Sequence, residues 1–188
     1  MKRTSQSHPL QIAEVSVGAG LGLVGVTFAP GKKQPGAKSG PWHRDLATDL
    51  DAVAAWNAAA VLTLVEPHEL KALDIADIGQ QVRRRHMEWH HWPIADVSVP
   101  SASFETTWKN EFRSIACILQ GGSNVLVHCK GGLGRAGMIA ARILVQLGTD
   151  PMNAIEAVRA FRPGAIETAP QEAWVRDGAG HRFSRRLR

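Results

Sequence analysis

The stretch that decides how this chain folds is Val127-His128-Cys129-Lys130-Gly131-Gly132-Leu133-Gly134-Arg135-Ala136-Gly137. Residues 124–128, with the apolar run Val125-Leu126-Val127 at their centre, predict a buried strand before the loop, and residues 136–147 predict a helix after it. Three of the five residues between the cysteine and the arginine are glycines, which let successive backbone N–H groups point into one concavity. Because a helix N-terminus adds partial positive charge, the stretch predicts an anion-binding loop between a strand and a helix.

Cys129 and Arg135 are the residues of this loop that can carry chemistry. The cysteine ends the predicted strand, and the arginine can bind two oxygens of a phosphoryl group. A free cysteine has a pKa of about 8.5, and a shift of roughly 3 units towards the thiolate corresponds to about 4 kcal/mol. We therefore expect Cys129 to act as a nucleophile. The expected phosphate-binding residues are Lys130, Gly131, Gly132, Leu133, Gly134 and Arg135.

Other interpretations of the same loop are weaker. A Walker-type nucleotide loop needs Gly-x-x-x-x-Gly-Lys-Ser/Thr, which is not present here. A metal site needs more ligands than His128 and Cys129, so we expect no metal and no other cofactor. A structural buried cysteine beside a glycine turn stays open as an alternative.

The rest of the chain predicts strands that alternate with helices. Such alternation indicates an α/β fold, with a central, mainly parallel sheet flanked by helices. We expect a single domain over residues 1–175, with its core at about 28–175. The expected strands are 14–17, 23–29, 58–65 and 87–92, and 30–41 is expected to be a loop. The expected helices are 44–57, 69–85 (broken near Asp74 or Gly79), 103–120, 150–161 and 168–175.

The net charge of +5 is concentrated at the C-terminus. Residues 176–188 hold five arginines and one acid, whereas residues 1–175 hold the other 17 basic and 16 acidic residues. We read 176–188 as a solvated basic tail and do not expect a nucleic-acid partner, although a contact with an acidic partner stays open.

The two cysteines suggest a reducing compartment, and no apolar run is long enough to span a membrane. The apolar stretch 10–28 is interpreted as two short strands, near 14–17 and 23–29, rather than a leader peptide, because Glu14 and several glycines interrupt it. The expected location is cytoplasmic, without a membrane partner.

The loop resembles the His-Cys-x5-Arg signature of the cysteine-dependent protein tyrosine and dual-specificity phosphatases. Pro93-Ile94-Ala95-Asp96, preceded by His90-His91, is similar to the general-acid loop of this family. Gly164-Ala165-Ile166-Glu167-Thr168, followed by Gln171, resembles a further family segment. The resemblance covers about residues 28–175 and implies a dual-specificity phosphatase-like fold.

The resemblance also assigns roles to individual residues. It implies that Asp96 is the general acid, which protonates the leaving oxygen as the P–O bond breaks. It implies that His128 supports the loop, and that Gln171 positions water for hydrolysis of a phosphocysteine; a surface position on a helix is the alternative for Gln171. Lys130 adds positive charge at the pocket mouth, while Leu133 departs from lipid-phosphate phosphatases. The expected substrate is therefore a phosphorylated protein or peptide.

Ala136 is the main departure from the family, which usually has Ser or Thr immediately after the arginine. That hydroxyl helps the cysteine sulfur to leave as a thiolate, so its loss predicts slower breakdown of the phosphocysteine. The leading hypothesis is a protein phosphatase that acts on phosphotyrosine, with phosphoserine and phosphothreonine left open. The alternatives are a catalytically weak phosphoprotein-binding module and a different cysteine reaction, such as arsenate reduction or sulfur transfer.

Overall fold

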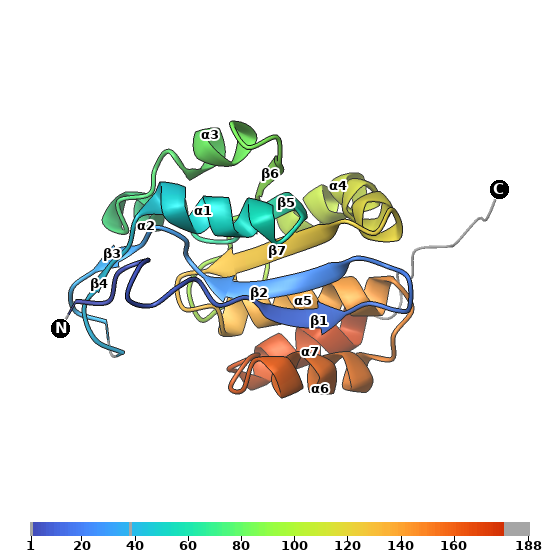
Figure 1. Cartoon of the computed structure of the whole chain (residues 1–188). Helices are drawn as coiled ribbons and strands as arrows, with labels where there is room; N and C mark the ends of the chain where they lie inside the picture. The colour runs from blue at the N-terminus through green and yellow to red at the C-terminus, as the bar shows by residue number, and fades with distance from the viewer. Residues whose placement is uncertain (1, 38, 179–188) are drawn as a thin grey trace.

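The computed structural model describes residues 2–37 and 39–178 as a five-stranded sheet between two groups of helices (Figure 1). The strand order is β1-β2-β7-β5-β6; β1 is antiparallel to β2, and the other neighbours are parallel. This arrangement confirms the expected α/β fold. The strands are β1 (Ala13–Ser16), β2 (Leu23–Phe28), β3 (Lys33–Gln34), β4 (Trp42–His43), β5 (Ala58–Thr63), β6 (Glu88–His91) and β7 (Asn124–Cys129). The helices are α1 (Leu46–Ala55), α2 (Pro67–Ala72), α3 (Ile78–Arg83), α4 (Ala102–Gln120), α5 (Gly134–Gln146), α6 (Pro151–Phe161) and α7 (Ala169–Asp177).

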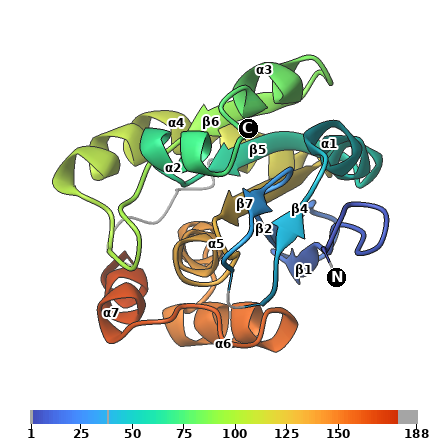
Figure 2. The same cartoon turned by 90° about the vertical axis from the view of Figure 1, so that its left-hand side faces the viewer.

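The central strand β7 is buried along its whole length, because helices pack on both of its faces. Helices α1 to α4 lie on one side of the sheet, and α5, α6 and α7 lie on the other (Figure 2). The apolar run that predicts the strand is therefore explained by burial on both faces, as is typical of parallel sheets. None of the described helices is both long and apolar enough to cross a bilayer.

The loops that follow the parallel strands meet at one edge of the sheet. Residues 29–32 follow β2, 64–66 follow β5, 92–101 follow β6 and 130–133 follow β7. Ligands of open α/β sheets bind outside the carboxyl ends of the strands, so this edge is where the fold favours a site.

The expected helix over residues 69–85 is two helices. The chain breaks between α2 and α3, where Asp74 adopts a left-handed backbone conformation with φ 56°. The break near Asp74 is therefore confirmed, whereas the alternative at Gly79 is wrong. Gly79 lies inside α3, where a Cβ would come within 2.5 Å of the Trp89 ring, so the glycine serves close packing.

Several other elements also differ in extent from the sequence-based expectation. The expected loop 30–41 contains β3, which pairs with β4. Helix α5 begins at Gly134 rather than Ala136, so the connection from β7 is only residues 130–133. Helix α7 continues to Asp177, and residues 179–188 of the expected basic tail lie outside the described residues.

A cluster of aromatic side chains anchors the loop that follows β6. Trp92 is buried, and its ring centroid lies 6.0 Å from that of Phe104 and 5.6 Å from that of Trp108, both on α4. The Trp92 indole N–H donates a hydrogen bond to Glu111 Oε2 at 2.8 Å. The start of the loop that carries Asp96 is thus fixed by packing and by a hydrogen bond.

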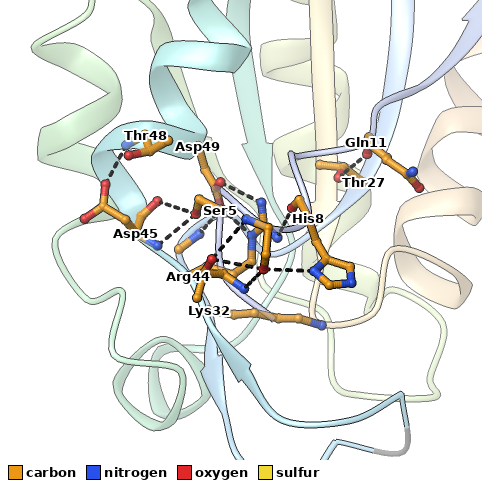
Figure 3. Close-up of polar contacts among 12 residues, drawn as sticks. Ser5, His8, Gln11, Thr27, Lys32, Arg44, Asp45, Thr48 and Asp49 are labelled. Carbon is orange, nitrogen blue, oxygen red and sulfur yellow. Dashed lines mark hydrogen bonds and ion pairs between the residues drawn. The ribbon is translucent and has the colours of Figure 1, made fainter. Parts of the chain in front are cut away.

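A fully buried ion pair between Arg44 and Asp49 holds the N-terminal segment that precedes β1. Arg44 donates from Nε and Nη2 to the two carboxylate oxygens of Asp49, each at 2.7 Å (Figure 3). Its Nη1 donates to the His8 carbonyl at 2.7 Å, and the Gly31 N–H donates to Asp49 Oδ2 at 2.8 Å. The pair therefore joins the N-terminal segment, the loop after β2 and α1.

We expect Asp49→Ala to lower the free energy of unfolding by about 3–5 kcal/mol, because it leaves the Arg44 charge buried without its partner. Urea denaturation measures the change. Asp51→Asn is the control, since Asp51 forms an exposed ion pair with Arg85 that contributes at most about 1 kcal/mol. Equal effects of the two substitutions would contradict the structural role of the buried pair.

Candidate active site

Cys129 lies at the end of β7 with only 3% of its surface exposed. The loop after it curls back, so that the Gly132 N–H donates to Cys129 Sγ with an N–S distance of 3.2 Å. Gly132 has φ 71°, and a Cβ there would lie 2.4 Å from the Thr27 carbonyl carbon. Only glycine fits this close approach to β2, and the amide that it presents favours negative charge on the sulfur.

Arg162, which follows the last residue of α6, donates hydrogen bonds to the loop 130–133. Its Nε donates to the Gly132 carbonyl at 2.9 Å, and its Nη2 donates to the Gly131 carbonyl at 3.2 Å. Burial lowers the pKa of Arg162, and the nearby Cys129 opposes that shift. The hydrogen bonds occupy carbonyl dipoles that would otherwise oppose an anion in the loop.

Arg135 is buried and held by a carboxylate that sequence analysis did not assign. Its Nη1 and Nη2 bind the two oxygens of Glu69, with Nη2–Oε1 at 2.9 Å, and Nη1 also donates to the Ile94 carbonyl at 3.0 Å. Burial would raise the pKa of Glu69, but the hydrogen bonds and charge of Arg135 outweigh it and hold this pKa below its usual value. Glu69 therefore stays ionised and orients the guanidinium.

Asp96 also contacts Arg135, with Oδ1 2.9 Å from Nη2. Its side chain remains 57% exposed, so it borders solvent as well as the arginine. The next residue, Val97, has φ 59° and is 64% exposed. A left-handed conformation is strained for a β-branched residue, and such strain is found mostly at functional sites.

One cavity of about 570 Å³ brings the three expected catalytic residues together. Cys129, Arg135 and Asp96 all line it, although Asp96 is 33 positions before the cysteine in the sequence. The expected phosphate-binding residues Lys130, Gly131 and Leu133 also line it, and Gly132 and Gly134 complete the turn between them. The arrangement can bind an anion against a thiol, with a carboxyl group beside it.

His128 is completely buried next to the nucleophile. The Trp89 indole N–H can only donate, and it donates to Thr63 Oγ1 at 2.8 Å. The Thr63 hydroxyl is then free to donate to His128 Nε2, which is 2.8 Å away. Burial, together with the charges of Arg135 and His91 and against the opposing effect of the Cys129 backbone, lowers the pKa of His128 to about 3. His128 is therefore neutral near pH 7 and can orient the end of β7 without moving a proton.

Gln171 is not a surface residue, so that alternative is wrong. It is 0% exposed, its Oε1 accepts from the Glu167 N–H at 3.0 Å, and its Nε2 donates to the Ser98 carbonyl at 3.3 Å. It thus ties the segment 164–168 to the loop that carries Asp96. The water-positioning role implied by the family resemblance stays a prediction.

Sequence analysis missed Glu69 and Arg162 as parts of the site. Glu69 lies 66 positions before Arg135, and Arg162 follows the loop by about 30 positions, so no local spacing connects them to it. Among residues 2–37 and 39–178, the structure contains no cluster of three or more His, Cys, Asp or Glu side chains that could hold a metal ion.

Comparisons with known proteins indicate the family of the chain. Residues 36–149 match the family model described as Tc-R-P, "Polymorphic toxin system, DSP-PTPase phosphatase". The chain is similar to cyclin-dependent kinase inhibitor 3 of Rattus norvegicus, with 27% identity over 146 residues, which are 76% of this chain and 68% of the rat protein.

Two solved structures extend the comparison to the fold. A crystal structure of kinase-associated phosphatase, with its catalytic cysteine replaced by serine, superposes with a TM-score of 0.78 at 23% identity, covering 94% of this chain and 99% of the other. The active form of Tk-PTP gives a TM-score of 0.63 at 30% identity, covering 91% and 98% of the two chains.

We expect Arg162→Met to weaken the binding of inorganic phosphate about tenfold. The substitution removes one positive charge and the hydrogen bonds that Arg162 donates to the Gly131 and Gly132 carbonyls. Isothermal titration calorimetry measures the dissociation constant. Arg176→Met is the matched control, since Arg176 forms an exposed pair with Glu172 on α7. Unchanged affinity in Arg162→Met would show that Arg162 does not serve anion binding.

Proposed function

The chain belongs to the DSP-PTPase phosphatase family of polymorphic toxin systems, and from this premise we propose that it hydrolyses phosphate monoesters on phosphorylated proteins through a phosphocysteine at Cys129. The observation that carries the proposal is the shared cavity, in which the thiol of Cys129 lies with Arg135 and Asp96. A nucleophile, an anion-binding cation and a proton donor are the groups that this reaction requires.

In the first step, the Cys129 thiolate attacks the phosphorus atom. The amides of the loop and Arg135 hold the non-bridging oxygens, where negative charge develops. A new S–P bond forms as the P–O bond to the substrate breaks, and Asp96 transfers its proton to the leaving oxygen. The products are the dephosphorylated side chain and the phosphocysteine.

In the second step, water replaces the sulfur. The Asp96 carboxylate takes a proton from water while the water oxygen attacks phosphorus and the S–P bond breaks. Inorganic phosphate is released, and the thiolate and the protonated Asp96 are restored. Gln171 lies beside Gly134, and its hydrogen bonds to the Glu167 N–H and the Ser98 carbonyl tie it to the Asp96 loop, from where we propose that it positions this water.

Phosphotyrosine is the substrate we favour, with phosphoserine and phosphothreonine as further substrates. The cavity of about 570 Å³ has aromatic and aliphatic sides formed by Phe28, Trp42, Val97 and Leu133, which suit an aryl phosphate. We also propose a cytoplasmic location, supported by the free thiols of Cys117 and Cys129.

Ala136 favours a second candidate function, a module that binds phosphoproteins and turns over slowly. This residue is fully buried in the first turn of α5 and has no hydroxyl to offer the sulfur. The two functions differ in the rate of the second step and not in binding.

We expect Asp96→Asn to lower kcat for a phosphotyrosine peptide by about 10²–10³-fold. The effect should be smaller for para-nitrophenyl phosphate, because nitrophenolate leaves more readily without a proton. Assays include a chelator, with Cys129→Ser as the inactive reference and Asp51→Asn as the matched control. Activity in Cys129→Ser, or equal losses on both substrates, would contradict the assigned roles.

We expect Ala136→Ser to raise the steady-state rate on para-nitrophenyl phosphate, because the added hydroxyl stabilises the departing thiolate. Rapid-quench kinetics should show a burst of nitrophenol in the parent protein that is smaller in the variant. A parent rate that matches or exceeds that of the variant would show that Ala136 does not limit turnover.

A further inference from the structure

We propose that Lys32, which lies outside the phosphate loop, is a second cation of the active site and stabilises the anion at Cys129. Its ammonium group would stabilise the thiolate first and the bound phosphoryl group afterwards. The second half of this assignment rests on the proposed function, whereas the first half concerns only the state of the thiol.

The position of Lys32 supports this role. It follows β2, is 4% exposed and lines the same cavity as Cys129. Its Nζ donates one hydrogen bond, to the Lys130 carbonyl at 3.3 Å. An ammonium group has three N–H donors, so this acceptor does not satisfy all of them. No carboxylate in the described ranges 2–37 and 39–178 lies within ion-pair distance of it. A buried ammonium that lacks a carboxylate partner is suited to an anion that enters the cavity.

Two aromatic rings hold the ammonium in place. Nζ lies 4.8 Å from the centroid of Phe28 and 4.7 Å from that of Trp42. Cation–π attraction offsets part of the desolvation of the charge without neutralising it. The side chain therefore keeps its charge available on the cavity side.

The backbone of Lys32 is also fixed. The Arg44 N–H donates to the Lys32 carbonyl at 3.2 Å; Figure 3 shows both residues. The N–H of Gly31, the residue before Lys32, donates to Asp49 of the buried ion pair. Gly31 has φ 72°, and a Cβ there would lie 2.6 Å from Leu46 Cβ. Because the buried pair and this close approach set the conformation, little reorganisation is needed when an anion binds.

The surrounding charges agree with the geometry. Burial is the main cause that lowers the pKa of Lys32 to about 8; Cys129 opposes this shift, and Arg44, Arg162 and Lys130 contribute to it. Arg3 lines the same cavity, and its guanidinium lies over the Trp42 ring. Lys32 is thus charged near neutral pH. It lies among other cations, and a bound anion would reduce the repulsion between them. Above about pH 8 it loses its proton and the stabilisation.

The neighbouring Lys33 provides a matched control. It lies on β3 and forms an exposed ion pair with Asp74 rather than lining the Cys129 cavity. Lys33→Met removes the same charge from the adjacent position in the sequence. Any effect that is confined to Lys32→Met therefore comes from the cavity and not from net charge.

The first measurement is the pH dependence of Cys129 alkylation by iodoacetamide, resolved from Cys117 by peptide mass spectrometry. In Lys32→Met we expect Cys129 to react several-fold more slowly at about pH 6, because fewer molecules carry the thiolate. We expect Lys33→Met to follow the parent protein. A Lys32→Met profile that coincides with the parent profile would overturn the assignment.

The second measurement is inorganic phosphate binding in the Cys129→Ser background, where no thiolate forms. We expect Lys32→Met to weaken binding about tenfold and Lys33→Met to leave it unchanged. Should Lys32→Met fail to fold, the Cys129→Ser protein alone tests the same point, because its affinity should fall as the pH rises through the pKa of Lys32, which burial holds below its usual value. Affinity that is independent of pH across this range overturns the proposal.

Neither measurement requires turnover, so the two proposals fail separately. A protein that shows the Lys32 effects but hydrolyses no phosphopeptide contradicts the proposed function alone. A protein that hydrolyses phosphopeptides with identical alkylation and phosphate binding in Lys32→Met contradicts the Lys32 assignment alone.

Discussion

Positive charge at the carboxyl end of β7, buried at Arg135 and Lys32 and half-buried at Arg162, is the constraint on which the rest of the site depends. A charge removed from water costs several kcal/mol unless it is paired or hydrogen-bonded. Arg135 finds its partner on α2, Arg162 binds the loop carbonyls, and Lys32 lies between two aromatic rings. Elements far apart in the sequence are thereby drawn to one sheet edge. The excess of positive charge there favours a thiolate and a phosphate dianion.

The same charges position the proton donor. Asp96 contacts Arg135 from a loop whose start is anchored by Trp92 and whose far side is tied to Gln171. An anion bound at Arg135 would therefore lie next to the carboxyl group that acts on the leaving oxygen. The strained backbone of Val97 lies directly beside this contact. Binding and proton transfer thus share one arginine, and the anchored loop limits how far the acid can move from it.

The sequence predicted those parts of the site that lie within one short segment of the chain. The cysteine, the glycine turn and Arg135 form one strand–loop–helix unit, so their spacing was sufficient, and the resemblance to the family added Asp96. Glu69, Arg162 and Lys32 could not be found in this way, because only the folded sheet brings their loops to Cys129. For Gln171 the resemblance located the segment, but its burial depends on packing against α5 and the Asp96 loop. The sequence left the break in the helix over 69–85 open between Asp74 and Gly79, because a glycine that serves close packing cannot be told from one that ends a helix without the contact to Trp89.

Detection of the covalent intermediate tests directly whether Cys129 is the nucleophile. The protein is mixed with para-nitrophenyl phosphate, quenched in acid during turnover, digested and analysed by mass spectrometry. The account predicts one added phosphoryl group on the peptide that contains Cys129, and none on that peptide in Cys129→Ser. Turnover with no phosphoryl group on Cys129, or with the group on another side chain, would contradict it.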